Sequence, residues 1–466
     1  MTRSWTERRT GRRVWLRGAL GAGALAVGWP KTAQALPHGP IKRDPRGILD
    51  LPDGFEYDVV ERVGARMDDG FLVPGRPDAM GCFPLDQGRF ALMRNHELAP
   101  GASTAPFTTS MGPPAESYSK HGVGGVSRVV FDAASGRRLS SNLVLAGTTL
   151  NCAGGLSPWG WLSCEETTET GHGYVFLCDP KASRVAPPQR IAAYGRFRHE
   201  AAVVHPRTFV AYMTEDQMDS ALYRFVPASR DQPFKGRFQA LVVTGRPRAD
   251  TAPARSGDRF EVTWVDVPNP VPADDSVRYQ AREGGAARFA RGEGMWLAGD
   301  AIYFTATAGG PIGRGQVFRL DTRTSELEVL YASEDPHLLD MPDNLTVGPT
   351  GIVYLAEDGP GGNLLRILAP SGELMPLARN AASIGEFAGV CFSPDQRTMF
   401  VNLQDDGLTL AVRGPFETVL TALSAPSKSG QTSEGFPPFP PGVAGLGTGA
   451  GLVAVAAMVA RSRKRE

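Results

Sequence analysis

Residues 292–310 read GEGMWLAGDAIYFTATAGG, two apolar runs separated by Gly299 and Asp300. Short runs of apolar and aromatic residues on either side of such a turn are typical of a β-hairpin. Because the turn lies at one edge of an antiparallel hairpin, the first strand begins and the second strand ends at the opposite edge. We therefore expect Glu293 and Thr307, at the two outer ends of this hairpin, to be neighbours.

The same arrangement recurs along the chain. An apolar run followed by polar, mostly acidic residues occupies residues 89–97, 160–166, 208–216, 301–310, 352–359 and 399–407, each preceded by a partner run and a turn. The same geometry makes neighbours of three further pairs: Glu200 with Glu215, Asn344 with Glu357, and Glu386 with Asp405. Repetition of this unit around an axis predicts an all-β fold, a six-bladed β-propeller with the acids at one mouth of its central channel. The alternative is a β-sandwich or mixed fold whose acids are solvent-exposed strand ends.

The N-terminal 35 residues have the pattern of an export signal. Arg12 and Arg13 are followed by VWLR, a Gly/Ala-rich segment and the small-residue site TAQA, which ends at Ala35. This pattern predicts a twin-arginine signal peptide over residues 1–35, and therefore export by the twin-arginine machinery to the periplasm or cell surface. An ordinary secretory signal is the alternative. The propeller domain is expected over residues 36–423.

The C-terminal end predicts a membrane association. Residues 424–442 form a linker rich in Pro, Ser and Gly, and the uncharged residues 443–460 that follow are long enough for a minimal membrane span. The basic end RSRKRE would stay on the cytoplasmic side. We expect residues 443–466 to be a weak membrane anchor or sorting tail, with a mobile tail as the alternative.

Charge excludes one class of partner. Residues 36–460 contain 38 bases and 47 acids, a net charge of −9, although the whole chain is neutral. Such a surface does not recruit nucleic acid, but it suits a protein that gathers divalent cations. We expect a monomer.

Converging carboxylates need cations, because like charges held together without water raise each other's pKa and destabilise the fold. Oxygen ligands favour hard ions such as calcium. Cys164, directly before Glu165 and Glu166, breaks this uniformity, because a thiolate favours a transition metal. The pattern predicts a mixed cluster, with a buried free thiol as the alternative for Cys164.

The other cysteines and the basic residues beside the acids leave alternatives open. Cys82, Cys152, Cys178 and Cys391 lie in apolar or turn contexts and are expected to be packing residues or to include one disulfide pair. His96 and His199 each precede a glutamate, so they would orient ligands or bind a leaving group, or be satisfied core histidines. Arg94 and Arg198 would pair with the same acids or hold a phosphate.

Seven segments resemble one known family, the PhoX-type alkaline phosphatases, which are bacterial phosphomonoesterases exported by the twin-arginine route. In chain order, these segments are RNHE (94–97), SPWGWLSCEE (157–166), GRFRHEAAVVHP (195–206), TEDQMDSALYRFVP (214–227), GEGMWLAGDAIYFTATAGG (292–310), DNLTVGPTGIVYLAEDG (343–359) and EFAGVCFSPDQRTMFVNLQ (386–404). They cover most of residues 80–416, so the resemblance is to the whole domain.

The resemblance implies a six-bladed propeller with a cluster of Fe³⁺ and Ca²⁺ at the channel mouth. The implied metal ligands are Cys164, Glu165, Glu166, Glu200, Glu293 and Glu357, with Glu97, Glu215 and Asn344 as further candidates. The cysteine would hold iron and the carboxylates would bridge iron to calcium. Glu166, Arg198 and His199 are the residues expected to act on a small phosphate-ester substrate.

The implied reaction is hydrolysis of phosphate monoesters by a metal-bound oxide or hydroxide. No GxSxG elbow or other side-chain nucleophile stands out, which agrees with this mechanism. A calcium-dependent lactonase or esterase is the second reading, and a non-catalytic surface propeller that binds a partner is the third. Iron together with calcium favours the phosphatase, whereas calcium alone favours the lactonase.

Overall fold

The structure is a computed structural model that describes residues 39–348 and 351–416. These residues belong to one compact unit. The expected signal peptide (1–35), linker (424–442) and C-terminal anchor (443–466) lie outside the described residues. Among the helices within them, none has the length and apolar character to cross a bilayer.

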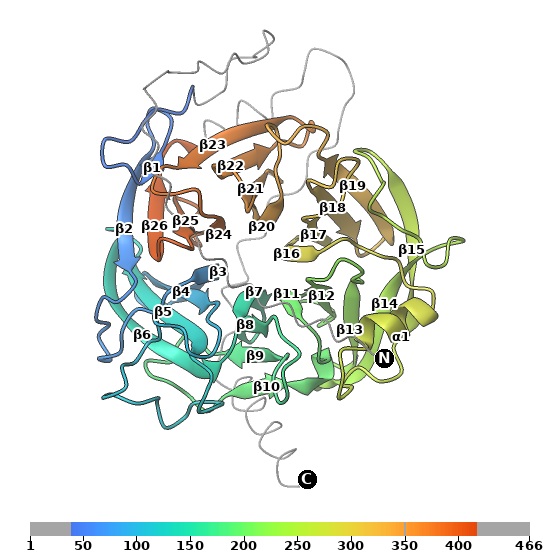
Figure 1. The fold of residues 1–466 in the computed structure, drawn as a ribbon, viewed down its shortest axis with the longest axis horizontal. Coiled ribbons are helices and arrows are strands. Elements are labelled where there is room, and N and C mark those ends of the chain that lie inside the picture. The colour runs from blue at the N-terminus through green and yellow to red at the C-terminus, as the bar shows by residue number, and fades with distance from the viewer. Residues whose placement is uncertain (1–38, 349–350, 417–466) are drawn as a thin grey trace, which may run out of the picture. The chain divides into compact units, whose positions relative to one another are not determined.

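The described residues form five antiparallel sheets arranged around a common axis (Figure 1). One sheet contains β3 (Pro77–Leu85), β4 (Arg89–His96), β5 (Gly124–Asp132) and β6 (Arg137–Thr148). The next contains β7 (Asn151–Ser157), β8 (Gly160–Glu165), β9 (Val175–Cys178) and β10 (Gln189–Ile191). This arrangement confirms an all-β, propeller-like fold.

A nine-stranded sheet follows in the chain and contains two four-stranded meanders. The first consists of β11 (His199–Val204), β12 (Ala211–Glu215), β13 (Tyr223–Ser229) and β14 (Gln232–Val243). The second consists of β16 (Gly292–Ala298), β17 (Ala301–Ala306), β18 (Gln316–Asp321) and β19 (Glu326–Ala332). Their outer strands are bridged by β15 (Arg259–Asp266), which pairs with β14 on one side and β19 on the other.

The last two sheets combine strands from both ends of the described chain. One contains β20 (Pro342–Val347), β21 (Val353–Glu357), β22 (Leu364–Leu368), β23 (Leu374–Asn380) and β1 (Leu49–Asp50). The other contains β24 (Phe387–Phe392), β25 (Thr398–Leu403), β26 (Leu408–Arg413) and β2 (Glu56–Arg62). Because β2 pairs with β26, N-terminal residues complete the last sheet and close the ring.

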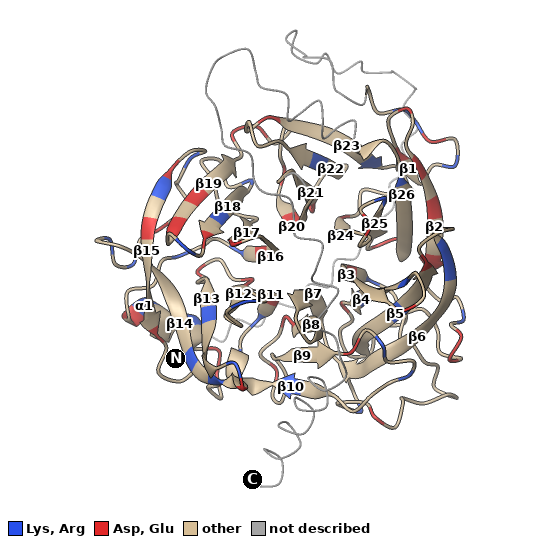
Figure 2. Ribbon diagram, turned by 180° about the vertical axis from the view of Figure 1, so that it is seen from behind, with Lys and Arg blue, Asp and Glu red and all other residues tan. Residues whose placement is uncertain are grey.

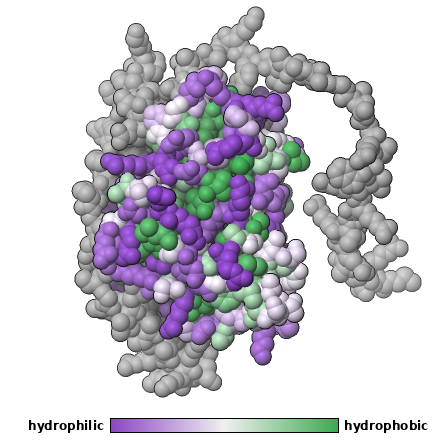
Figure 3. Space-filling view, turned by 90° about the vertical axis from the view of Figure 1, so that its left-hand side faces the viewer, coloured by the Kyte–Doolittle hydropathy of each residue, from purple (hydrophilic) through white to green (hydrophobic). Residues whose placement is uncertain are grey.

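The helices are short and lie outside the sheets. They are the 3₁₀ helix η1 (Ala192–Tyr194) and the α-helix α1 (Val277–Glu283). Apolar side chains fill the spaces between neighbouring sheets, as expected for strands that are buried on both faces. The outer strands β2 and β15 instead carry acidic and basic residues (Figure 2), and polar residues surround small apolar patches on the flank that Figure 3 shows.

The six strands nearest the axis pack closely, and glycine makes one of these contacts possible. Gly389 in β24 has φ +64°, and a Cβ atom at this position would overlap the backbone carbonyl oxygen of Asp78 in β3. Only glycine combines this left-handed conformation with so close an approach at low cost. The junction between the first and last sheets therefore depends on Gly389.

We predict that Gly389→Ala destabilises the protein more than Gly372→Ala. Both glycines have positive φ, but nothing lies within 4 Å of the Cβ position at Gly372. The control variant should lose only about 1 kcal/mol through its backbone conformation, whereas Gly389→Ala should lose about 1–3 kcal/mol more through overpacking. Denaturant unfolding of the two variants measures this difference, and equal losses would contradict the close approach.

Candidate metal centre and active site

Each strand nearest the axis brings one ligating residue to the same end of the ring. This residue is the second one of the strand in β3, β7, β11, β16 and β20. In the sixth case it directly precedes β24. These residues are Asp78, Cys152, Glu200, Glu293, Asp343 and Glu386. Because each begins a hairpin at the edge away from its turn, all six lie at one end of the ring of inner strands.

The second strands of these hairpins end beside the same residues. Pro77 pairs with His96, Asn151 with Glu165, and Pro342 with Glu357, so the outer ends of the hairpins are opposite each other, as the sequence predicts. The residue that follows each second strand adds a carboxylate at this end in four of the hairpins. These residues are Glu97, Glu166, Asp216 and Asp358.

A one-residue register slip positions the ligating residues of the inner strands. His199 pairs with Glu215, whereas Ala202 pairs with Met213, so Glu200 lies in a β-bulge of β11. The same slip occurs in the hairpins that begin with β3, β7, β16, β20 and β24. Bulges bend a strand and redirect a side chain, and they are common beside active sites.

The backbone just before the inner strands is strained in four hairpins. The residues at this position have positive φ although none is glycine: Arg76 (42°), Leu150 (48°), Arg291 (57°) and Met341 (53°). Such conformations are uncommon for large side chains and cluster at functional sites. The strain occurs at the point where the chain turns into the bulged strand.

Three groups of residues overlap here, and within each group the possible ligand atoms all lie within 4.8 Å of one another. They are Asp78, Glu97 and Cys152; Cys152, Glu166 and Glu200; and Glu200, Glu293 and Asp343. Cys152 and Glu200 each belong to two groups, so the three groups form one continuous series. Seven ligating residues from hairpins far apart in the sequence are thus brought together.

Three more carboxylates belong to the same region. Asp358 and Glu386 are hydrogen-bonded to each other, and Asp216 lies close enough to raise the pKa of both Glu166 and Glu293. We define the mouth cluster as these three residues and the seven above: Asp78, Glu97, Cys152, Glu166, Glu200, Asp216, Glu293, Asp343, Asp358 and Glu386.

Three arginines compensate part of this negative charge. Arg76 lies 2.7 Å from Glu97 and 3.8 Å from Glu386, and Arg291 lies 2.8 Å from Glu293. Arg291 also contacts Asp216 at 2.8 Å. Arg198 lies 3.5 Å from Glu166, and its side chain is 41% exposed. Among the described residues, nine carboxylates of the mouth cluster thus share three arginines.

This imbalance appears in the pKa values. Burial raises the pKa of Glu166 to about 7, with further contributions from Asp216 and Glu97, and burial and Asp358 raise that of Asp343 to about 7. The pKa of Glu200 lies well above its usual range because the carboxyl is buried near Asp343 and Glu166. Burial and Glu200 likewise raise the pKa of the Cys152 thiol. Without cations, the folded protein therefore disfavours deprotonation of these groups.

Three expected ligands have protein partners instead. Glu165 accepts hydrogen bonds from the backbone N–H groups of Thr149 (3.1 Å) and Gly173 (2.9 Å), and lies 2.6 Å from His172 Nδ1. Glu215 accepts a hydrogen bond from the Tyr223 hydroxyl at 2.7 Å and lies 3.4 Å from Arg278.

Glu357, the third of these, forms a buried ion pair with Arg366 at 2.8 Å. Its other oxygen accepts a hydrogen bond from the Leu364 N–H group. Each of the three is the last residue of its strand, and successive side chains of an extended chain point to opposite sides. The following residues, Glu166, Asp216 and Asp358, point to the mouth cluster instead.

Two other expected site residues lie in the hydrophobic core. Cys164 is fully buried in β8, in a core cluster with Leu162 and Val175, and is absent from the three ligand groups. His199 is also fully buried, its ring packs on Phe197, and burial lowers its pKa to about 3. Cys152, which the sequence suggests is a packing residue, is the cysteine in the mouth cluster.

The remaining expected residues have mixed positions. Glu97, Glu166, Glu200 and Glu293 are in the mouth cluster, whereas Asn344 is replaced there by its neighbour Asp343. His96 and Arg94 are buried and have protein partners: His96 lies 2.8 Å from Ser127 Oγ, and Arg94 pairs with Glu61 at 2.7 Å.

Sequence reasoning also missed residues of the mouth cluster. Asp78 and Asp343 are second residues of inner strands, as Glu200 and Glu293 are, so aligning the starts of the first strands would have identified them. Aligning the residues that follow the second strands would have added Asp216 and Asp358.

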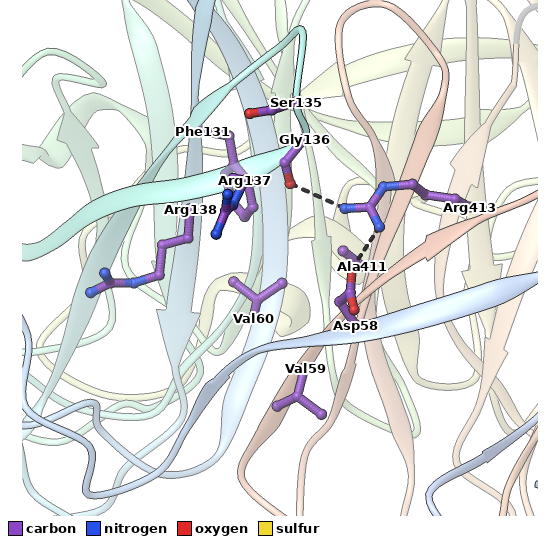
Figure 4. A pocket seen from close by; sticks show the side chains of 10 residues that line it. All are labelled: Asp58, Val59, Val60, Phe131, Ser135, Gly136, Arg137, Arg138, Ala411 and Arg413. Atoms are coloured by element: carbon purple, nitrogen blue, oxygen red, sulfur yellow. Dashed lines mark hydrogen bonds and ion pairs between the residues drawn. The ribbon is translucent and has the colours of Figure 1, made fainter.

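A separate pocket of about 320 Å³ contains none of these residues. It lies between β2, β26 and the β5–β6 hairpin (Figure 4). Arg413 spans part of it, donating hydrogen bonds to the Gly136 carbonyl at 3.1 Å and to Asp58 at 2.6 Å. Because β4 ends beside the mouth cluster and β5 begins there, the β5–β6 turn is at the opposite end of the sheet. The pocket is therefore distinct from the candidate site.

We predict that metal-free protein becomes less stable as the pH rises from about 4 to above 7. The folded-state pKa values of Glu166 and Asp343, about 7, exceed their unfolded values of 4.5 and 3.8. In this range the folded state binds more protons than the unfolded state, so the unfolding free energy falls as the pH rises. Thermal unfolding of chelator-treated protein measures this trend, and added cations should reverse it at pH 8.

Two isosteric variants provide the matched control for this prediction. At pH 8 without metal, Glu200→Gln should raise the melting temperature, because a neutral amide avoids the cost of keeping an ionisable carboxyl buried among other acids. Glu357→Gln should lower it, because it weakens the buried ion pair with Arg366. A lower melting temperature for both variants would show that Glu200 is an ordinary buried carboxylate.

Comparison with known proteins identifies the family. The chain matches the family described as alkaline phosphatase PhoX over residues 36–407. No curated protein matches it in sequence. Its fold is similar to that of Pseudomonas fluorescens PhoX in complex with vanadate, a transition state analogue, with 18% identity, a TM-score of 0.62, and 82% of this chain and 98% of that chain covered.

A gluconolactonase from Xanthomonas campestris overlaps less well, with 10% identity, a TM-score of 0.39, and 78% of this chain and 97% of that chain covered. The family match spans every strand of the described residues except β26, and all residues of the mouth cluster. The chain belongs to the PhoX alkaline phosphatase family and is a hydrolase of the phosphatase class.

Proposed function

We propose that this protein hydrolyses small phosphate monoesters at the mouth cluster, with metal ions held by its carboxylates and Cys152. The observation that carries the proposal is the continuous series of three ligand groups linked through Cys152 and Glu200. Membership of a phosphatase family supports the class of reaction. The series of ligand groups supports the mouth cluster as the place where the reaction occurs.

The donor set fits two kinds of ion. The group of Glu200, Glu293 and Asp343 offers only carboxylate oxygens, which suit Ca²⁺. The groups that contain Cys152 add a sulfur ligand, which favours a transition metal, and we assign Fe³⁺ there. Cations would also remove the repulsion that raises the pKa values of Glu166, Glu200 and Asp343.

The ring of sheets is proposed to consist of six blades. The nine-stranded sheet would count as two blades, β11–β14 and β16–β19, with β15 as a strand shared between them. Each of the six inner hairpins carries the same register slip and a ligating residue at the same end. Six equivalent hairpins support six blades more directly than the number of sheets does.

Different residues of the mouth cluster and its arginines would have different roles in the reaction. Bound cations would withdraw charge from the phosphoryl oxygens and activate the attacking group. Arg198 is the arginine suited to the substrate, because it is exposed and its one ion-pair contact among the described residues, with Glu166 at 3.5 Å, is loose, whereas the equally exposed Arg76 pairs with several acids. Arg76 and Arg291 each pair with two acids of the mouth cluster and would fix the positions of these carboxylates.

We predict that Cys152→Ser and Cys164→Ser have opposite outcomes. Cys152→Ser removes the sulfur ligand, so bound iron should be lost and hydrolysis of a chromogenic phosphate monoester should fall at least about 100-fold. Cys164→Ser changes a core position, so it should lower the melting temperature but keep metal and activity. Elemental analysis and the assay measure both, and loss of iron only in Cys164→Ser would reverse the assignment.

Arg198→Ala should weaken substrate binding. A charge-assisted hydrogen bond to phosphate contributes about 1.5–3 kcal/mol, so we predict a decrease in kcat/KM of about 10- to 100-fold with unchanged metal content. Arg207→Ala is the matched control, because Arg207 is an exposed arginine that pairs with Asp300 away from the mouth cluster. Equal kinetics of Arg198→Ala and the parent protein would exclude Arg198 from phosphate binding.

A further inference from the structure

Two cysteines outside the mouth cluster lie on the two sides of the junction between the first and last sheets. Cys82 lies in β3, and Cys391 lies in β24. The Cys391 thiol lies close enough to raise the pKa of Cys82, and neither cysteine is in a disulfide. Two cysteines that are far apart in the sequence are thus neighbours in one packed cluster.

The surroundings hold both side chains in place. Cys391 is fully buried in a core cluster with Met80, Leu92 and Phe400, and Cys82 packs against this cluster while staying partly exposed. Nearby, the Cβ position of Gly389 adjoins the Asp78 carbonyl, so the two strands are in direct backbone contact. The two cysteines therefore belong to one closely packed strand junction.

We propose that Cys82 and Cys391 are a site of disulfide formation that covalently closes the ring of sheets. The oxidant is a disulfide-bearing compound or protein of the oxidising compartment to which residues 1–35 are expected to direct the chain. Cys82, the partly exposed thiol, is the one that such an oxidant reaches first.

The reaction is ordinary thiol–disulfide exchange. The Cys82 thiolate attacks the oxidant, forms a mixed disulfide and releases one thiol of the oxidant; Cys391 then attacks Cys82 and releases the second. Two protein thiols lose two electrons and two protons in total, and one disulfide of the oxidant is reduced to two thiols. Burial, together with Cys391, raises the pKa of Cys82, so exchange should be faster at higher pH.

The bond would strengthen the junction where the ring closes. There, the first and last sheets are joined by side-chain packing, and β2 completes the last sheet by pairing with β26. The new bond would close a loop of about 310 residues, and the cross-linking of long loops removes the most entropy from the unfolded chain. For a domain of this size we expect an increase in melting temperature on the order of 5 °C.

The other three cysteines are located elsewhere. Cys152 belongs to the mouth cluster, and Cys164 and Cys178 are buried in two other core clusters. Cys178 therefore provides a matched control for substitution of a core cysteine.

The test uses the purified full chain, reduced and then incubated with oxidised glutathione at pH 8. After denaturation, maleimide labelling should show three free thiols instead of five, and peptide mapping should find Cys82 joined to Cys391. The oxidised monomer should melt about 5 °C higher than the reduced one. Phosphatase activity serves only as a check that the protein is folded.

The variants separate the bond from general effects of oxidation. Cys178→Ser should still form the bond and gain stability, whereas Cys82→Ser should keep four free thiols and show no increase in melting temperature. Cys391→Ala should behave as Cys82→Ser does, which covers the case in which one substitution disturbs folding. Five free thiols in the oxidised parent protein, or a linked pair that includes another cysteine, would overturn the proposal.

Discussion

The electrostatic repulsion within the mouth cluster is the constraint on which the rest of the structure depends. Nine carboxylates are held near one another, three of them buried and six partly buried, and three arginines compensate only part of their charge. Buried like charges are stable only if they are protonated or bind cations. A fold that gathers them must therefore have enough stability elsewhere to hold the cluster, and that stability comes from the packed sheets.

The packed inner strands of the sheets hold the acids of the mouth cluster in place. Each ligating residue of an inner strand comes from a different hairpin, and a register slip redirects it toward its neighbours. Two of the strained residues that precede bulged strands, Arg76 and Arg291, are themselves arginines that pair with the acids. Backbone strain and charge compensation thus occur in the same residues, so neither can be changed without the other.

The sequence predicted the hairpins well but predicted the side-chain directions poorly. The run at 160–166 matches β8 within one residue, because strand periodicity and turns are local properties. The choice between neighbouring acids is not local. Glu165 and Glu166 are chemically alike, yet Glu165 accepts backbone hydrogen bonds and Glu166 belongs to the mouth cluster. The difference arises because β8 ends at Glu165, so the two side chains point in opposite directions. The same shift by one residue separates Glu215 from Asp216 and Glu357 from Asp358.

Shared ligands make the proposed metal sites depend on one another. Cys152 lies between the first and second groups and Glu200 between the second and third, so an ion in one group would fix a ligand of the next. Because Cys152, Glu200 and Asp343 belong to three different sheets, ions bound there would also cross-link the sheets at the mouth. Metal affinity and the stability of the ring are then two measures of the same contacts. A substitution that loosens the inner strands should therefore weaken metal binding even where it touches no ligand.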